Sequence, residues 1–168
     1  GFCMVNINCE EGDEWQNQKK GVCWIVEKIG DKAFICTGSL VNNTAKDKKP
    51  YILSAFHCTE DLASNVSTSK EDYNQWMFYF HMERTGCDNA SSVRYHKTMQ
   101  GCSRVVAIPV ENGSDGLLLL LNENIPENYD VYFNGWDRTN SISLSGVGIH
   151  HPGGDFKKIS TYGNHLPS

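Results

Sequence analysis

Long hydrophobic runs are missing from this chain of 168 residues. The longest apolar run is the five leucines Leu117 to Leu121. A membrane-spanning helix needs about 20 apolar residues, so we expect no membrane span. A signal peptide is also missing at the N-terminus, as it would be in a mature or trimmed protein.

Positively charged residues are also few. The chain has 15 Lys and Arg against 20 Asp and Glu, which gives a formal net charge of −5. Binding to nucleic acid depends on Lys and Arg that neutralise phosphates, so we expect no nucleic-acid partner. Hydrophobic residues make up 39% and charged residues 21% of the chain, a balance typical of a globular domain.

Helical periodicity is scarce, and there is no internal repeat or low-complexity tract. Short β-rich runs recur instead, separated by Gly, Asn, Asp and Pro turns. This spacing of short strands indicates an all-β barrel or sandwich. The expected strands are Gly21 to Ile29, Phe34 to Val41, Tyr51 to Ala55, Gln75 to His81, Val105 to Pro109, Leu117 to Leu121, Val131 to Trp136 and Gly146 to His150.

Paired C-x-x-C motifs are absent although the chain has seven cysteines. A zinc ribbon is therefore not expected. Singly spaced cysteines are typical of a disulfide framework in an oxidising compartment, which indicates a secreted, periplasmic or cell-envelope protein. Because the count is odd, one cysteine has no partner within the chain.

One disulfide follows from a predicted hairpin. The strands around Phe34 to Val41 and Tyr51 to Cys58 flank a polar loop. If the chain folds back about Asp47, Cys36 lies opposite Cys58 and Val41 lies opposite Leu53. Opposed residues of an antiparallel pair have Cα atoms about 4.5–5.5 Å apart, within disulfide range. We therefore predict a Cys36–Cys58 bond, with a bulge as the feature that would shift this register.

Two polar residues stand next to buried strands. The stretch "PYILSAFHC" ends an apolar strand on His57, and "ENGSDGLLLLLN" places Asp115 just before the leucine run. A catalytic histidine needs a carboxylate to hold its ring in one tautomer. Taken alone, His57 is equally a satisfied core residue and Asp115 an Asx-turn residue, so both interpretations stay open.

The segments "CTGSLV", "SAFHC", "SDGLLLLL", "GWDR" and "GIHHP" with "KKIS" occur in this order from Cys36 to Ser160. Together they resemble the first two-thirds of a trypsin-like serine protease, and above all the bacterial lysyl endopeptidase group. The resemblance implies His57 as general base and Asp115 as the residue that orients it. The mechanism needs neither a metal nor an organic cofactor, and the substrate would be a protein or peptide, cut possibly after lysine.

The resemblance also implies a fold of two Greek-key β-barrels with the active site in the cleft between them. Residues 1–128 would form the N-terminal segment and the first barrel, which carries both catalytic residues. Residues 129–168 would begin a second, incomplete barrel. One departure from the group is Phe56, where a polar residue or another histidine would be expected.

The nucleophile segment Gly-x-Ser-Gly is missing from the sequence. The nearest look-alike, Ser145 in "SLSGVG", follows a leucine and is not interpreted as the nucleophile. We therefore expect the reactive serine beyond residue 168 or on a second chain that completes the second barrel. The alternative function is a non-catalytic protease homologue that serves as a binding or adhesion module.

The family pattern implies two further cysteine pairings. Cys9 would bond to Cys87, and Cys3 would bond to a cysteine of the completing segment, which would explain the odd count. Cys23 and Cys102 remain outside the family pattern. We expect these two to bond to each other, because one added disulfide is simpler than two unpaired cysteines in an oxidised barrel.

Overall fold

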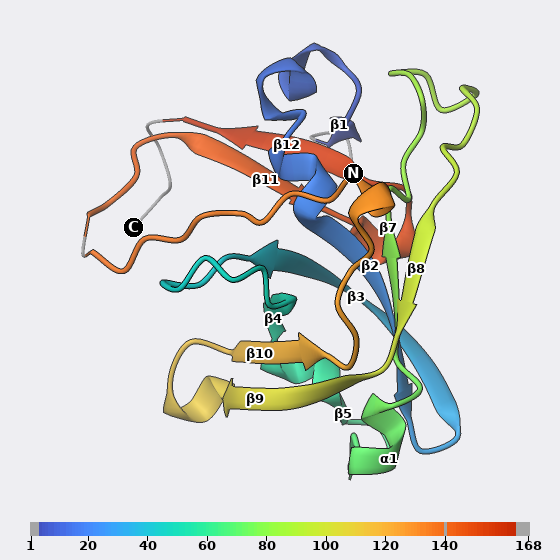
Figure 1. The fold of residues 1–168 in the computed structure, drawn as a ribbon, viewed down its shortest axis with the longest axis vertical. Coiled ribbons are helices and arrows are strands. Elements are labelled where there is room, and N and C mark those ends of the chain that lie inside the picture. Colours follow the sequence, from blue (N-terminus) through green and yellow to red (C-terminus); the bar gives the residue numbers. More distant parts are fainter. Residues whose placement is uncertain (1–3, 140, 164–168) are drawn as a thin grey trace.

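The structure is a computed structural model that describes residues 4–139 and 141–163. It is built mainly of β-strands, arranged as a strongly curled sheet and a smaller sheet beside it (Figure 1). Within the described part of the chain, no helix is long and apolar enough to cross a membrane. The fold is therefore all-β, as the sequence predicted.

The larger sheet has seven antiparallel strands in the order β8-β7-β2-β3-β4-β10-β9. Their bounds are β2 (Val22–Ile29), β3 (Lys32–Val41), β4 (Tyr51–Ala55), β7 (Met77–Phe80), β8 (Lys97–Gln100), β9 (Cys102–Ile108) and β10 (Gly116–Leu121).

A single residue forces this sheet to curl. Strands β8 and β9 form its two opposite edges, yet only Gly101 separates them along the chain. The two edges must therefore meet at this point, which closes the sheet into a barrel. Gly101 has φ +81, and a Cβ there would lie 2.6 Å from the Asn122 amide nitrogen. Glycine tolerates such a backbone conformation at no steric cost.

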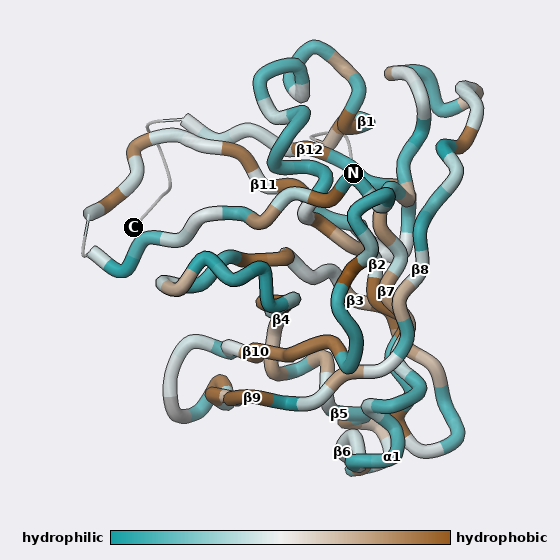
Figure 2. Tube along the Cα trace, in the orientation of Figure 1, coloured by the Kyte–Doolittle hydropathy of each residue, from teal (hydrophilic) through white to brown (hydrophobic). Residues whose placement is uncertain are grey.

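The core lies inside this barrel. Alternate residues of each strand point inward, so Leu117, Leu119 and Leu121 of β10 are buried, as are Phe78 and Phe80 of β7. Figure 2 shows the hydrophobic run along β10. Fully burying a large apolar side chain stabilises the fold by about 1.5–3 kcal/mol, so this interior is the main source of barrel stability.

The smaller sheet has the order β1-β12-β11, with β1 (Val5–Asn6), β11 (Gly146–His150) and β12 (Lys158–Tyr162). The N-terminal strand thus pairs with a strand from the far end of the described chain. The remaining elements are short: β5 (Glu60–Asp61), β6 (Val66–Ser67), α1 (Lys70–Tyr73), and the 3-10 helices η1 (Glu10–Trp15), η2 (Gln18–Gly21), η3 (Phe56–Thr59), η4 (Val110–Asn112), η5 (Glu127–Tyr129) and η6 (Pro152–Gly154).

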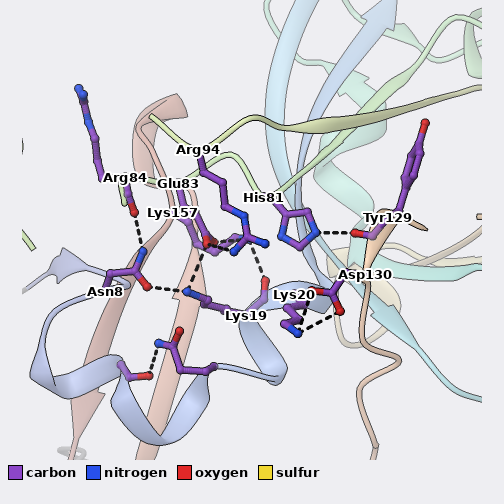
Figure 3. Close-up of polar contacts among 12 residues, drawn as sticks. Asn8, Lys19, Lys20, His81, Glu83, Arg84, Arg94, Tyr129, Asp130 and Lys157 are labelled. Atoms are coloured by element: carbon purple, nitrogen blue, oxygen red, sulfur yellow. Dashed lines mark hydrogen bonds and ion pairs between the residues drawn. The ribbon is translucent and has the colours of Figure 1, made fainter. Parts of the chain in front are cut away.

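A buried ion cluster joins the two sheets (Figure 3). The carboxylate of Glu83, fully buried, lies 3.2 Å from Lys19, 3.3 Å from Arg94 and 3.4 Å from Lys157. Lys157 also donates to the carbonyl of Lys19 at 2.8 Å, and burial lowers its pKa to about 8. Since Lys157 directly precedes β12 and Lys19 precedes β2, the cluster fixes one sheet against the other.

Two expectations about strands were wrong. The predicted strand Val131 to Trp136 is extended chain, which pairs with the end of β3 only through Asn134. The β3–β4 register places Val41 opposite Tyr51 and not opposite Leu53. The register is therefore shifted by two residues, and Cys58 lies beyond the end of β4, on η3.

Two of the expected disulfides are present: Cys36–Cys58 and Cys9–Cys87. Because η3 folds Cys58 back over β3, its Cα lies 6.3 Å from that of Cys36 despite the shifted register. Cys3 lies outside the described residues.

The expected Cys23–Cys102 bond does not form; both are free, buried thiols. They lie on β2 and β9, which are not neighbours in the sheet. Each thiol points to a nearby backbone carbonyl, that of Gly38 at 3.5 Å and that of Tyr73 at 3.7 Å. Burial raises the pKa of each to about 12, so both thiols stay protonated.

Candidate active site

His57 is held in place by its neighbours in η3. Strand β4 ends at Ala55, and the chain then turns into η3, where Cys58 is tied to β3 by its disulfide. Thr59 closes the turn by donating from its hydroxyl to the carbonyl of Phe56 at 2.8 Å. His57 therefore projects from a short helix that is anchored at both sides.

Strand pairing brings Asp115 to this helix. Gly116, the first residue of β10, lies opposite Ala55 of β4, so the residues next to them in the chain meet. The amide of Phe56 donates to the carbonyl of Asp115 at 2.9 Å. Asp115 has φ 55, a left-handed conformation that aspartate tolerates better than most residues, and this turns its side chain toward His57.

The carboxylate of Asp115 contacts His57 with both oxygens. Oδ1 accepts from the backbone amide of His57 at 2.9 Å, and Oδ2 lies 2.6 Å from ring Nδ1. These two bonds, the ring contact foremost, hold the pKa of Asp115 below its usual range. The carboxylate therefore stays ionised and selects the tautomer with hydrogen on Nδ1.

The other ring nitrogen of His57 faces outward. The His57 side chain is 60% exposed, and within the described residues Nε2 has no hydrogen-bond partner. A neutral ring with hydrogen on Nδ1 carries its lone pair on Nε2, so this atom can accept a proton from a reactant. The arrangement is that of a general base oriented by a carboxylate.

No described serine is hydrogen-bonded to His57. Ser54 donates to the carbonyl of Thr37 at 2.9 Å, and Ser145 lies in an exposed loop just before β11. The structure therefore brings together the two predicted catalytic residues without a nucleophile.

Cys36, His57 and Cys58 have ligand atoms within 4.8 Å of one another. The two sulfurs are bonded to each other, and zinc takes cysteine as a free thiolate. This group therefore does not form a metal site while the disulfide is intact.

A groove of about 380 Å³ opens beside His57. Its wall includes the Cys36–Cys58 disulfide and a residue that the sequence analysis did not single out, Glu27. Glu27 is 1% exposed, and burial raises its pKa to about 8. The sequence held a signal for it, because Glu27 falls in the same alternation along β2 as the apolar residues Cys23, Ile25 and Ile29, and alternate residues of a strand share one face.

Comparison with known proteins identifies a family and a similar fold. Residues 1–167 match the model of the family described as lysyl endopeptidase, C-terminal domain. Among solved structures, the protease Anisep from Arthrobacter nicotinovorans is similar in fold, with a TM-score of 0.53 and 15% sequence identity. The match covers 95% of this chain and 66% of that one. On the family match, this chain belongs to the lysyl endopeptidase C-terminal domain family.

Proposed function

We propose that the protein is a serine endopeptidase in which His57 is the general base and Asp115 orients it. The observation that carries this proposal is the double contact of the Asp115 carboxylate, 2.9 Å to the backbone amide and 2.6 Å to Nδ1 of His57. Both the family and the fold support a protease function.

In the proposed reaction a serine hydroxyl attacks the peptide carbonyl while Nε2 of His57 takes its proton. The ionised Asp115 stabilises the imidazolium that results, without accepting the proton itself. His57 then gives the proton to the leaving amine, and water repeats the sequence on the acyl-enzyme. Backbone amides beside the serine would stabilise the oxyanion.

The serine in this proposal comes from polypeptide other than these 168 residues, since they contain no Gly-x-Ser-Gly segment. The chain spans 66% of the length of the Anisep protein. We propose that residues 1–128 belong to the first barrel and 129–168 to a second barrel completed by a further segment or chain. Cys3 would bond to that segment.

Two further parts of the proposal concern the residue after which the protein cuts and its location. Cleavage after lysine is taken from the lysyl endopeptidase relationship. A secreted or periplasmic location follows from the two disulfides, because such bonds persist in oxidising compartments.

Labelling with a fluorophosphonate tests the enzyme directly. The protein containing this chain together with its completing segment should take up one label per molecule, and His57→Ala should abolish it. Asp115→Asn should lower the labelling rate on the order of 10⁴-fold, because the amide favours the wrong tautomer. Ser145→Ala is the matched control and should label normally.

The second candidate is a non-catalytic homologue that binds a partner without cutting it. The missing nucleophile segment favours it. A complete, folded protein that takes up no label and cuts no peptide would refute the enzyme and leave this second function.

A further inference from the structure

The Cys36–Cys58 disulfide lies directly beside His57. All three residues form part of the wall of the groove of about 380 Å³. Cys58 is buried, but Cys36 is half-buried and the His57 side chain is 60% exposed. The groove therefore gives small molecules and ions access to this disulfide from solvent.

Three atoms that can bind a metal meet at this point. The two cysteine sulfurs and a ring nitrogen of His57 lie within 4.8 Å of one another. Zinc binds thiolate sulfur at about 2.3 Å and imidazole nitrogen at about 2.0–2.1 Å in a tetrahedral arrangement, which places its ligand atoms on the order of 3.5–3.8 Å apart. The spacing of the three side chains therefore suits zinc once the two sulfurs are free to separate.

The backbone around the two cysteines allows that separation. The Cα atoms of Cys36 and Cys58 are 6.3 Å apart, toward the long end of the range for disulfides, about 4.4–6.8 Å. Pairing with β2 holds Cys36 on β3, and the bond from Thr59 to the carbonyl of Phe56 closes η3 around Cys58. When the bond between the sulfurs is broken, side-chain rotation can move them apart while both Cα atoms stay in place.

His57 is already oriented as a zinc ligand would be. Its Nδ1 lies 2.6 Å from the carboxylate of Asp115, and Nε2 has no hydrogen-bond partner within the part of the chain that the structure describes. A histidine that binds zinc through one ring nitrogen almost always donates the other N–H to a carboxylate, a carbonyl or water. Asp115 therefore leaves Nε2 with its lone pair available to a metal.

We propose that reduction of the Cys36–Cys58 disulfide creates a zinc site from two thiolates and Nε2 of His57. The reductant is a small dithiol, whose thiolate attacks one sulfur and breaks the protein S–S bond. The second thiolate of the dithiol displaces that protein sulfur, so the dithiol is oxidised to a cyclic disulfide and both cysteines become thiols. Zinc binds the two thiolates, their protons pass to water, and a water molecule fills the fourth position.

Zinc at this site would block proton transfer by His57. The metal occupies the lone pair of Nε2, which is the atom that accepts the proton in the proposed reaction. The protein would then be active in its oxidised form and reversibly inhibited by zinc in its reduced form. This effect on activity rests on the proposed endopeptidase function, whereas the binding of zinc does not.

Protection from alkylation tests the site without requiring cleavage of a substrate. The complete protein is reduced with dithiothreitol under nitrogen, freed of reductant by gel filtration, and treated with iodoacetamide with or without zinc chloride. Peptide mass mapping should show that zinc protects Cys36 and Cys58. Cys87, which is exposed and freed by the same reduction, should react equally in both samples and serves as the internal control.

Calorimetric titration with zinc chloride then tests the histidine. The reduced protein should bind one zinc ion that the oxidised protein does not bind. Asp115→Asn should weaken this binding by about 10–100-fold, as expected for the loss of the carboxylate behind a ligating histidine, and His57→Ala should weaken it at least as much. His96→Ala is the matched control, because it removes a histidine that stacks on Tyr95 and Tyr79.

Equal alkylation of Cys36 and Cys58 with and without zinc would overturn the proposal. Zinc affinity unchanged by both His57→Ala and Asp115→Asn would also overturn it. So would unfolding of the protein on reduction, seen in its near-ultraviolet circular dichroism, since the site needs the folded barrel to hold its three ligands. Zinc binding by a complete protein that takes up no fluorophosphonate in either redox form would refute the protease and not the zinc site.

Discussion

The carboxyl group of Glu27 is buried and has no hydrogen-bond partner among residues 4–139 and 141–163, which leads to a prediction about stability and pH. Burial raises its pKa from an ordinary value of 4.5 to about 8, and the unfolded chain exposes the same group to water. The folded state therefore holds the proton more tightly than the unfolded state. By linkage, the contribution of Glu27 to stability is most favourable below pH 4.5 and falls as pH rises through 8.

The size of the effect follows from that shift. Each unit by which a pKa differs between the two states is worth about 1.4 kcal/mol. A rise from 4.5 to about 8 thus costs the folded protein on the order of 5 kcal/mol above pH 8. This is a large part of the 5–15 kcal/mol typical of a whole domain.

Glu27→Gln should remove this cost, because the amide is neutral at every pH. Below pH 4.5 the variant and the unmodified protein should be about equally stable. Above pH 8 the variant should be more stable by on the order of 5 kcal/mol. Urea unfolding at intervals from pH 4 to pH 9, with linear extrapolation to water, measures the difference.

All other groups titrate alike in the two proteins, so their effect cancels in the difference between the two free energies of unfolding. Glu123→Gln, which removes an exposed carboxylate, is the control for loss of a surface charge. A constant difference across this pH range would refute the reasoning, since it would mean that Glu27 ionises freely in the folded state.

Three other perturbations test the scaffold. Glu83→Gln leaves the buried cation of Lys157 unpaired and should destabilise the protein by about 3–5 kcal/mol, measured by the same urea titration. Gly101→Ala should cost about 1–3 kcal/mol in that assay, since it forces a side chain into a left-handed conformation where β8 meets β9. In native protein Cys23 and Cys102 should resist iodoacetamide and react only after unfolding, as peptide mass mapping would show; rapid alkylation of either in the native state would contradict their burial and raised pKa.

The local features of this protein can be predicted from its sequence. The strands Tyr51–Ala55 and Gly146–His150 appear with the bounds that the alternation and turn residues predicted. The contact between His57 and Asp115 and the Cys9–Cys87 bond were implied by the resemblance to the lysyl endopeptidase group. The Cys36–Cys58 bond was predicted from a hairpin between strands close in the sequence.

The pairings between segments far apart in the sequence depended on how the barrel closes. Whether Cys23 faces Cys102, and whether Val131 to Trp136 finds a strand to pair with, depends on segments far apart in the chain, and both expectations were wrong. The β3–β4 register moved by two residues, and η3 still brought Cys58 back to Cys36. Alternation along β2 predicts that Glu27 points inward. Only the packing of the other strands around it leaves that carboxyl group buried and without a hydrogen-bond partner among the described residues.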